Sequence, residues 1–205
     1  FEEVKNIAKR LKKLYDIFHK RDTTSIRIVT TPEQIVLEEA RRNYTCLQLY
    51  DFNVDAIYIN KLYPEKAMEG YFKDWEDIQK HNIQLAEESF SEQKLFKLEM
   101  QNNEINGKES LEKIAKILYQ NINPIEIFCQ TEAFKMDDIN GTRILSIKLP
   151  FLKAENISVK KEKDDIIISL LNERRRFHLP DKLRTRKISS YSYENSELKI
   201  FMDYD

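Results

Sequence analysis

Two different spacings of hydrophobic residues divide the chain into a helix-rich front and a strand-rich rear. Up to about residue 120, apolar residues recur three or four positions apart, as in amphipathic helices, and these stretches alternate with short β-branched runs. From about residue 139 the helical spacing disappears and short alternating runs take over. The pattern predicts an α/β domain with a parallel sheet and flanking helices, followed by an all-β antiparallel sandwich.

The front part reads as strands separated by helices. Thr31 is a good helix N-cap, Pro32 fits the first helical position, and an Asp-Phe-Asn turn after Tyr50 ends that helix. Residues 2–20 are expected to form an amphipathic helix with one buried stripe. The predicted strands are 26–29, 54–59 and 94–100, and the further predicted helices are 32–50, a helix of about twenty residues around 68–85, and 109–119.

The rear part shows short runs whose alternate residues are apolar. These runs are separated by proline or by asparagine-containing pairs, as is typical of turns. We therefore divide the chain into residues 1–122, a linker at 123–138, and a β-sandwich at 139–205. The apolar positions lie in residues 145–149, 157–159, 166–170, 177–179 and 198–202.

Composition excludes several classes of protein. The formal net charge is −1, which gives no general attraction to nucleic acid or to an anionic membrane, so no nucleic-acid partner is expected. No apolar run is long enough for a transmembrane helix. Cys46 and Cys129 are far apart and lack Cys-x-x-Cys spacing, which favours a reducing cytoplasm over a disulfide framework or a zinc site. The first residue is Phe rather than Met, as expected if the chain is trimmed from a longer one.

No constellation of catalytic or metal-binding residues stands out. The chain has 3 Gly and no glycine-rich phosphate loop, and it has no His-Glu-x-x-His or Gly-x-Ser-x-Gly motif. Its histidines, His19, His81 and His178, lie on three different predicted elements. We therefore assign no catalytic residue and no metal ligand.

Asn60 is the most specific candidate for binding. It ends a buried strand in a strand–helix–strand unit, and ligands of such sheets bind beyond the carboxyl ends of the strands. Its amide offers a donor and an acceptor, which match the edge of an adenine ring. The alternative is an asparagine that ends a strand by satisfying the backbone of a loop.

Glu99 and Met100 form the second candidate, because the strand that they end should finish at the same edge of the sheet as Asn60. With Leu98 they begin a loop whose backbone could cradle the other side of a base. The alternative is an ordinary connecting loop.

The front part resembles the latter half of ArsA-type anion-transporting ATPases, a family that includes arsenical-pump ATPases and tail-anchored-protein targeting factors. The likeness covers roughly residues 1–120. It is carried by Ile28-Val-Thr-Thr-Pro-Glu33, Leu37-Glu-Glu-Ala-Arg-Arg42, Val54-Asp-Ala-Ile-Tyr-Ile-Asn-Lys-Leu62, Trp75-x-x-Ile-Gln79, Glu87-Glu-Ser-Phe90 and Glu104-Ile-x-Gly107 with Leu111.

The rear part is similar to the small-heat-shock-like (α-crystallin-like) domain appended to some bacterial and archaeal members, which is an immunoglobulin-like sandwich. The motifs that carry this likeness are Leu145-x-x-x-Leu-Pro-Phe151, Asp164-Asp-Ile-Ile-Ile168 and Arg174-Arg-Arg-Phe-His-Leu-Pro180.

The resemblance implies the rear part of a P-loop NTPase-type ATPase, usually a homodimer that encloses ATP and magnesium. The family's adenine-contacting asparagine falls on Asn60. Leu98-Glu99-Met100 replaces a Met-Pro-Leu-like loop, without its proline. The family's phosphate loop, switch aspartate and magnesium ligands belong to the N-terminal half, and none is present here. A zinc clasp and arsenite-binding cysteines have no counterpart either.

These expectations combine into one hypothesis and one alternative. The chain supplies the adenine-side pocket, through Asn60, Glu99 and Met100, and a C-terminal sandwich to an ATPase that couples ATP hydrolysis to anion transport or protein targeting. Its expected partners are the N-terminal ATPase half, a second copy, and a membrane-protein or other protein client. We expect no ATP hydrolysis by this chain alone. The alternative is a chaperone-like or regulatory interaction module without nucleotide turnover.

Overall fold

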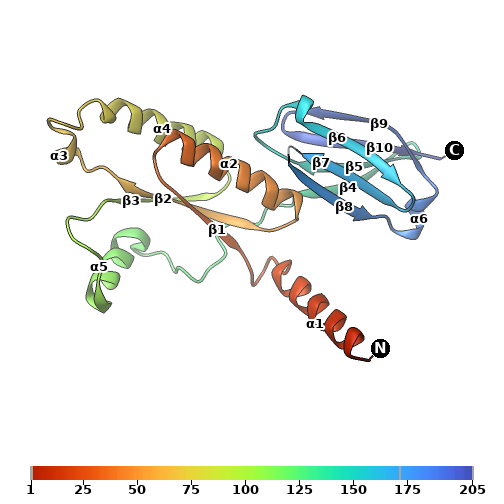
Figure 1. Ribbon diagram of the computed structural model, residues 1–205, viewed down its shortest axis with the longest axis horizontal. Coiled ribbons are helices and arrows are strands. Elements are labelled where there is room, and N and C mark those ends of the chain that lie inside the picture. The colour runs from red at the N-terminus through yellow and green to blue at the C-terminus, as the bar shows by residue number, and fades with distance from the viewer. Residues whose placement is uncertain (1, 171, 205) are drawn as a thin grey trace. The chain divides into compact units, whose positions relative to one another are not determined.

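The computed structural model describes residues 2–170 and 172–204, apart from the side chain of Lys182, and divides them into two compact units (Figure 1). The first unit comprises the chain up to Arg41 together with Asn53–Thr131. The second unit comprises Arg42–Phe52 together with the chain from Glu132 onward.

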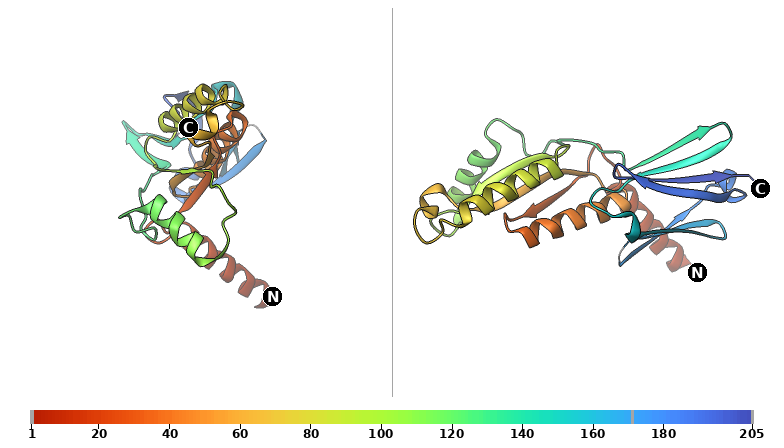
Figure 2. Two further views of the ribbon diagram at one scale, coloured as in Figure 1. Left: turned by 90° about the vertical axis from the view of Figure 1, so that its left-hand side faces the viewer. Right: turned by 90° about the horizontal axis from the view of Figure 1, so that it is seen from above.

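The first unit is built on a parallel sheet, as predicted. Its strands are β1 (Ile26–Thr30), β2 (Val54–Leu62) and β3 (Lys94–Glu99), in the order β1-β2-β3. Helix α4 (Trp75–Ser89) and the first half of α2 (Gln34–Leu49) lie on one face, and α5 (Gly107–Tyr119) lies on the other (Figures 1 and 2). The central strand is almost wholly buried because both faces are covered.

The helix predicted around residues 68–85 is wrong as a single element. The structure has a short α3 (Glu65–Met68), a turn, and then α4. Gly70 in this turn has φ +102°, a left-handed conformation that side-chain-bearing residues rarely adopt. The apolar spacing continues across the break because Met68 is buried against Gln79 of α4 and Phe72 stacks on Tyr63, and spacing alone therefore did not reveal it.

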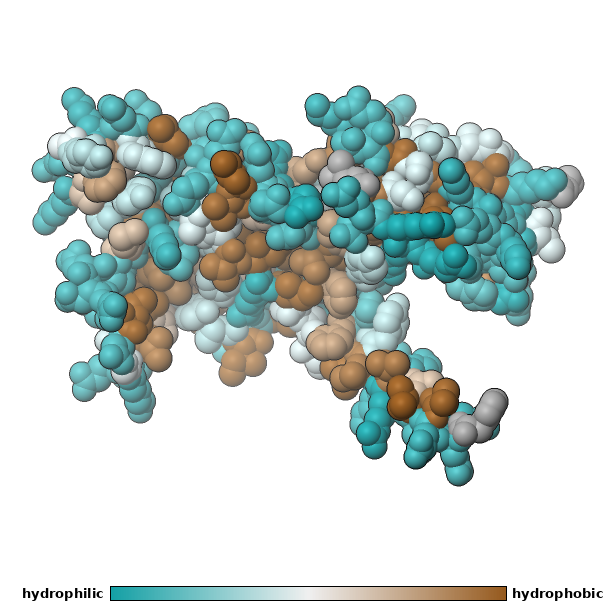
Figure 3. Space-filling view, viewed as in Figure 1, coloured by the Kyte–Doolittle hydropathy of each residue, from teal (hydrophilic) through white to brown (hydrophobic). Residues whose placement is uncertain are grey.

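Helix α1 (Glu2–Phe18) is present as predicted, but its apolar stripe is not buried among the described residues. Val4 is 68% exposed and Leu11 is 61% exposed, and Figure 3 shows apolar side chains along this helix. The basic residues of α1 lie between them along the sequence. None of the described helices combines the length and apolar character needed to span a bilayer.

Residues 124–131, here called the strap, are fastened to the first unit through polar side chains. Arg27 donates to two strap carbonyls at 2.8 and 3.0 Å. Asn53 donates to one strap carbonyl at 3.0 Å and accepts from one strap N–H at 3.2 Å. The buried carboxylate of Asp55 pairs with Arg27 at 3.3 Å and accepts a further strap contact, from a backbone N–H at 3.1 Å.

The second unit consists of two antiparallel sheets, in agreement with the predicted sandwich. One has the order β4-β5-β10-β9 and the other has the order β6-β7-β8. Their inner faces bury aliphatic residues such as Ile147, Ile168 and Leu198. The elements are β4 (Phe134–Ile139), β5 (Thr142–Lys148), η1 (Ala154–Asn156), β6 (Ile157–Glu162), β7 (Asp165–Leu170), β8 (Glu173–His178), α6 (Asp181–Arg184), β9 (Lys187–Glu194) and β10 (Glu197–Asp203).

Candidate functional site

The three predicted site residues lie around one cavity at the carboxyl edge of the parallel sheet. β2 and β3 are neighbouring parallel strands, so the residues that end them meet at this edge. The cavity has a volume of about 210 Å³. Its walls are formed by Asn60, Lys61, Leu98, Glu99, Met100, Gln101, Asn103, Glu104 and Ile105.

A bulge at the end of β2 fixes the amide of Asn60. The pairing with β3 shifts register between Ile59 and Leu62, and Lys61 has φ +58°. Its backbone N–H donates to Asn60 Oδ1 at 2.8 Å, which identifies that side-chain atom as the oxygen. The Nδ2 atom of Asn60 has no partner among the described residues, so both of its hydrogens and one oxygen lone pair are free to meet a ligand.

The backbone at Glu99 and Met100 is partly used within the protein. The N–H of Met100 donates to the carbonyl of Leu62 at 2.7 Å, which extends the pairing of β3 with β2. The carbonyl of Glu99 accepts from the side chain of Gln101 at 2.8 Å. Met100 is 43% exposed, so its thioether side chain offers an apolar surface at the cavity.

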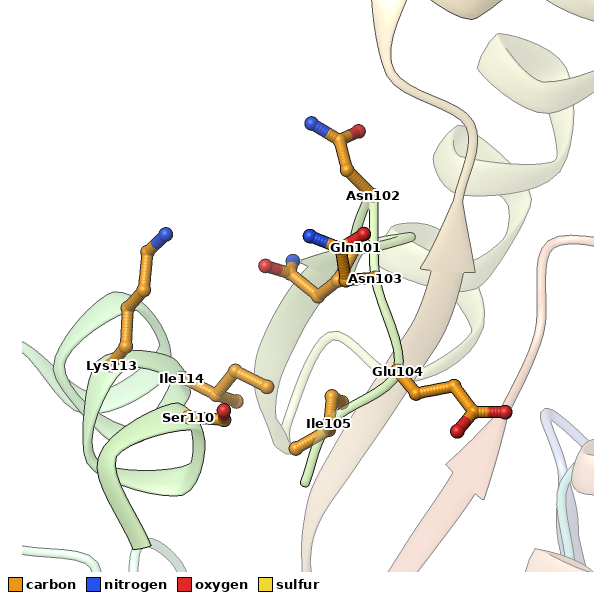
Figure 4. A pocket seen from close by; sticks show the side chains of 8 residues that line it. All are labelled: Gln101, Asn102, Asn103, Glu104, Ile105, Ser110, Lys113 and Ile114. Atoms are coloured by element: carbon orange, nitrogen blue, oxygen red, sulfur yellow. The ribbon is translucent and has the colours of Figure 1, made fainter. Parts of the chain in front are cut away.

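A second cavity, of about 220 Å³, lies between α5 and the loop after β3 (Figure 4). Figure 4 shows Ile105 of the loop and Ile114 of α5 with their side chains toward each other, while Lys113 extends from the helix. Amide and hydroxyl groups supply most of the rest of its lining. The two cavities share Gln101, Asn103, Glu104 and Ile105, so this loop forms a common wall.

Two buried amides of α4 hold the loops that leave this edge of the sheet. Gln79 is 6% exposed, accepts from Tyr63 N at 2.7 Å and donates to Tyr63 O at 3.1 Å. Asn82 is 4% exposed and donates to Pro32 O at 2.7 Å. Sequence reasoning assigned neither residue a role, although polar residues on the apolar stripe of a helix are a signal of buried hydrogen bonds.

Two further observations concern possible metal ligands and a titratable group on β2. The described residues contain no group of three histidine, cysteine or carboxylate side chains that could hold a metal ion. The Tyr58 hydroxyl, which lies against Tyr119, has its pKa raised to about 12, first by burial and then by that hydrogen bond. It therefore stays protonated at neutral pH.

Comparison with known proteins finds two family matches in one chain. The model of the family described as anion-transporting ATPase matches residues 1–120, and that of the HSP20-like domain found in ArsA matches residues 140–202. Together these matches cover the parallel sheet with its helices and most of the antiparallel sandwich, whose strand β4 precedes the second match.

Individual relatives agree with the family matches. A protein of Aquifex aeolicus (strain VF5), provisionally named arsenical pump-driving ATPase 1, is 34% identical over 98% of this chain and 52% of its own length. A similarly named protein of Prosthecochloris vibrioformis is 29% identical over 100% of this chain and 50% of its own. ATPase GET3 of Scheffersomyces stipitis is 27% identical over 60% of this chain and 37% of its own. The chain thus spans about half the length of the first relatives.

Solved structures of small heat shock proteins also align with part of the chain. The Del-C4 mutant of hsp14.1 from Sulfolobus solfatataricus P2 aligns with 35% of this chain and 74% of its own, at 20% identity and a TM-score of 0.31.

Proposed function

Because the chain belongs to the anion-transporting ATPase family, we propose that the cavity beside Asn60 receives the adenine of ATP in a longer ATPase. That ATPase couples ATP hydrolysis to anion transport or to protein targeting. The cavity, of about 210 Å³, is smaller than the ~300–1,000 Å³ of pockets that enclose whole ligands, and it therefore suits a base alone.

The amide of Asn60 is the observation that supports this proposal. An asparagine side chain can bond adenine through two contacts, donating from Nδ2 to a ring nitrogen and accepting at Oδ1 from the exocyclic amine. Asn60 retains both capacities after its bond to Lys61 N. The side chain of Met100 is placed to pack against the face of the ring.

The phosphates and magnesium of ATP are assigned to residues beyond this chain. The described residues contain no group of three or more histidine, cysteine or carboxylate side chains that could hold a metal ion. In phosphoryl transfer the metal neutralises charge on the phosphates, together with a phosphate-binding loop that these 205 residues lack. This chain alone is therefore expected to bind the base weakly and not to hydrolyse ATP.

The exposed apolar surface of the first unit supports the N-terminal half of the ATPase as a partner. The stripe of α1 is exposed, and Val29 of the edge strand β1 is 65% exposed. Parallel sheets are normally covered on both faces, so these surfaces suit further strands and helices of the same domain. A homodimer that encloses ATP, in the cytoplasm, completes the proposal.

Binding of adenosine tests the proposal on the chain as it stands. Titration of ¹⁵N-labelled protein with adenosine should shift the side-chain amide signal of Asn60, and Asn60→Ala should weaken binding about tenfold or more. Asn102→Ala is the matched control, because Asn102 lines only the second cavity. Equal affinity of the Asn60→Ala variant and the unaltered chain would refute the role of Asn60. ATP turnover by the purified chain that persists in Asn60→Ala would contradict the whole assignment.

A groove of the sandwich supports a second candidate function, capture of extended protein segments without nucleotide. A cavity of about 800 Å³ lies between β6 and β9, which are edge strands of the two sheets. Val159 and Ile188 give it an apolar lining, and edge strands can pair with an added peptide strand. Suppression of aggregation of a denatured client in the absence of ATP would support this function; no effect at a tenfold excess would oppose it.

A further inference from the structure

Helix α4 carries two buried amides on one face, one turn apart, and each reaches a loop that follows a strand of the parallel sheet. Gln79 bonds the backbone of Tyr63, after β2, and Asn82 bonds the carbonyl of Pro32, after β1. Residues three apart share a face of a helix. The two side chains are similarly buried, but only Tyr63 lies close in sequence to residues that line the base cavity, two positions after Lys61.

The two bonds that Gln79 makes to Tyr63 fix the exit of β2 in both position and orientation. One side-chain amide meets both the N–H and the carbonyl of Tyr63, so neither backbone group can turn away without losing a buried hydrogen bond. Tyr63 lies three residues after Asn60. Between them, Lys61 has its left-handed backbone and Leu62 accepts from Met100 N. The segment that presents Asn60 is therefore held at its end by α4 and along its side by β3.

We propose that Gln79 is a positioning residue that sets the base selectivity of this cavity, by holding Tyr63 and through it the bulge that presents the amide of Asn60. The inference rests on the proposed adenine site. Gln79 does not touch the base. Its effect depends on its ability to donate and to accept at once, which among side chains of this size is a property of glutamine and of a protonated glutamate.

Substitutions of the two amides separate positioning from ordinary structural support. Gln79→Met keeps the size of the side chain and removes both hydrogen bonds to Tyr63. Gln79→Glu restores a donor and an acceptor only while its carboxyl is protonated, and burial favours that neutral form. Asn82→Leu is the matched control, because it removes a buried amide from the same helix face but releases a loop that does not line the cavity.

The readout is the ratio of the affinities for adenosine and guanosine, measured by NMR titration at pH 5 and pH 8, with thermal melting to verify folding. In the unaltered chain and in Asn82→Leu, adenosine should be preferred about tenfold or more at both pH values. In Gln79→Met the preference should fall to about twofold or less. In Gln79→Glu it should be retained at pH 5 and decline toward pH 8. The other titrating groups of the protein are also present in the unaltered chain and in Asn82→Leu. Any change of the affinity ratio with pH in these two proteins therefore measures the contribution of those groups.

Three results would refute either the positioning role of Gln79 or the proposed adenine site. A folded Gln79→Met variant that keeps the full preference for adenosine would overturn the positioning role. So would a Gln79→Glu variant that matches Gln79→Met at both pH values. If the unaltered chain shows neither an adenosine preference nor a shift at Asn60, the proposed adenine site itself fails, and the positioning role fails with it. If Gln79→Met does not fold, the comparison of Gln79→Glu at pH 5 and pH 8 decides.

Discussion

Replacing Arg27 with methionine should release the strap from the first unit and destabilise that unit strongly. The substitution removes the donors to two strap carbonyls and the guanidinium that stacks 4.7 Å from the ring centre of Phe128. It also leaves the carboxylate of Asp55, whose side chain is 0% exposed, without its cationic partner. Methionine keeps an unbranched apolar stem, so the loss reports mainly on the charge and the hydrogen bonds.

The expected cost follows from the burial of Asp55. Removing one partner of a buried ion pair costs about 3–5 kcal/mol, because the remaining charge is left uncompensated. With a urea dependence near 2 kcal/mol per M, the midpoint of unfolding should fall by about 2 M. Lys97→Met is the control, since the pair of Lys97 with Glu87 is exposed and such pairs contribute at most about 1 kcal/mol.

Trp75 provides a probe that reports on the first unit alone, because the chain has a single tryptophan and it begins α4. Urea titrations followed by its fluorescence therefore measure the unit that contains Arg27. Similar midpoints for Arg27→Met and Lys97→Met would refute the reasoning, because they would mean that the Arg27–Asp55 pair contributes no more than a surface pair.

Cys129, within the strap, gives an independent measure of release. Burial, and then the charge of Asp55, raise the pKa of its thiol above the usual value of 9.0, so little thiolate is present near neutral pH. In a Cys46→Ser background, Cys129 should react slowly with iodoacetamide, and Arg27→Met should accelerate this reaction several-fold without denaturant. An unchanged rate would show that the strap stays in place without Arg27.

Three further predictions concern single positions in the two units. Lys61→Gly should stabilise the first unit by up to about 1 kcal/mol in the Trp75 assay, because Lys61 has φ +58° and glycine adopts that backbone at lower cost; a loss of stability would contradict this. The hydrogen bond from His178, followed by the contact of Arg176, lowers the pKa of Asp165 below its ordinary 3.8. The ionised carboxylate of Asp165 therefore stabilises the folded state fully above about pH 3.8, and this stabilisation is lost as the pH falls through the lowered pKa. Acid titration by circular dichroism should accordingly show less loss below pH 4 in Asp165→Asn than in the unaltered chain, whereas parallel curves would exclude the effect. Leu198→Ala should destabilise the second unit by about 2–5 kcal/mol in thermal melts, since Leu198 is fully buried in the core of the sandwich, and a loss below 1 kcal/mol would argue against that core.

Most regular elements of the first unit, and the meeting of the candidate residues, could be predicted because both follow from local pattern. A strand that ends at Asn60 and a parallel strand that ends at Met100 must finish at the same edge of the sheet if they are neighbours. The bulge at Lys61 could not be predicted, because it depends on the pairing of Leu62 with Glu99, which lies far along the chain. Likewise, no pattern near Gln79 indicates that its amide bonds Tyr63.

The strands missing from the prediction are edge strands of the larger sheet. β4 (Phe134–Ile139) and β9 (Lys187–Glu194) each pair with one neighbour and bury few side chains. A strand with one free edge and partly solvated faces has little need of alternating aliphatic residues, so β9 is rich in serine and tyrosine instead. The inner strands, such as β7 (Asp165–Leu170), carry the apolar signal because both neighbours and the core constrain them.

The apolar stripe of α1 shows what a hydrophobic pattern cannot predict. The periodicity correctly predicts a helix and an apolar face, but burial requires a partner surface, and the described residues supply none. The pattern of an amphipathic helix therefore identifies the face that is suited to burial, but it does not identify the surface that packs against that face.

Buried polar side chains fasten the first unit at both ends of β2. At its amino end, Asn53 and Asp55 hold the strap, and at its carboxyl end Gln79 holds Tyr63. The eleven residues from Asn53 to Tyr63 span about 30 Å as a strand, and the two sets of bonds share no partner. Sites this far apart perturb stability independently. Release of the strap should therefore leave the base cavity intact. Loss of the bonds between Gln79 and Tyr63 should alter the cavity while the strap stays bound. The two sets of buried hydrogen bonds can therefore be studied separately in one chain.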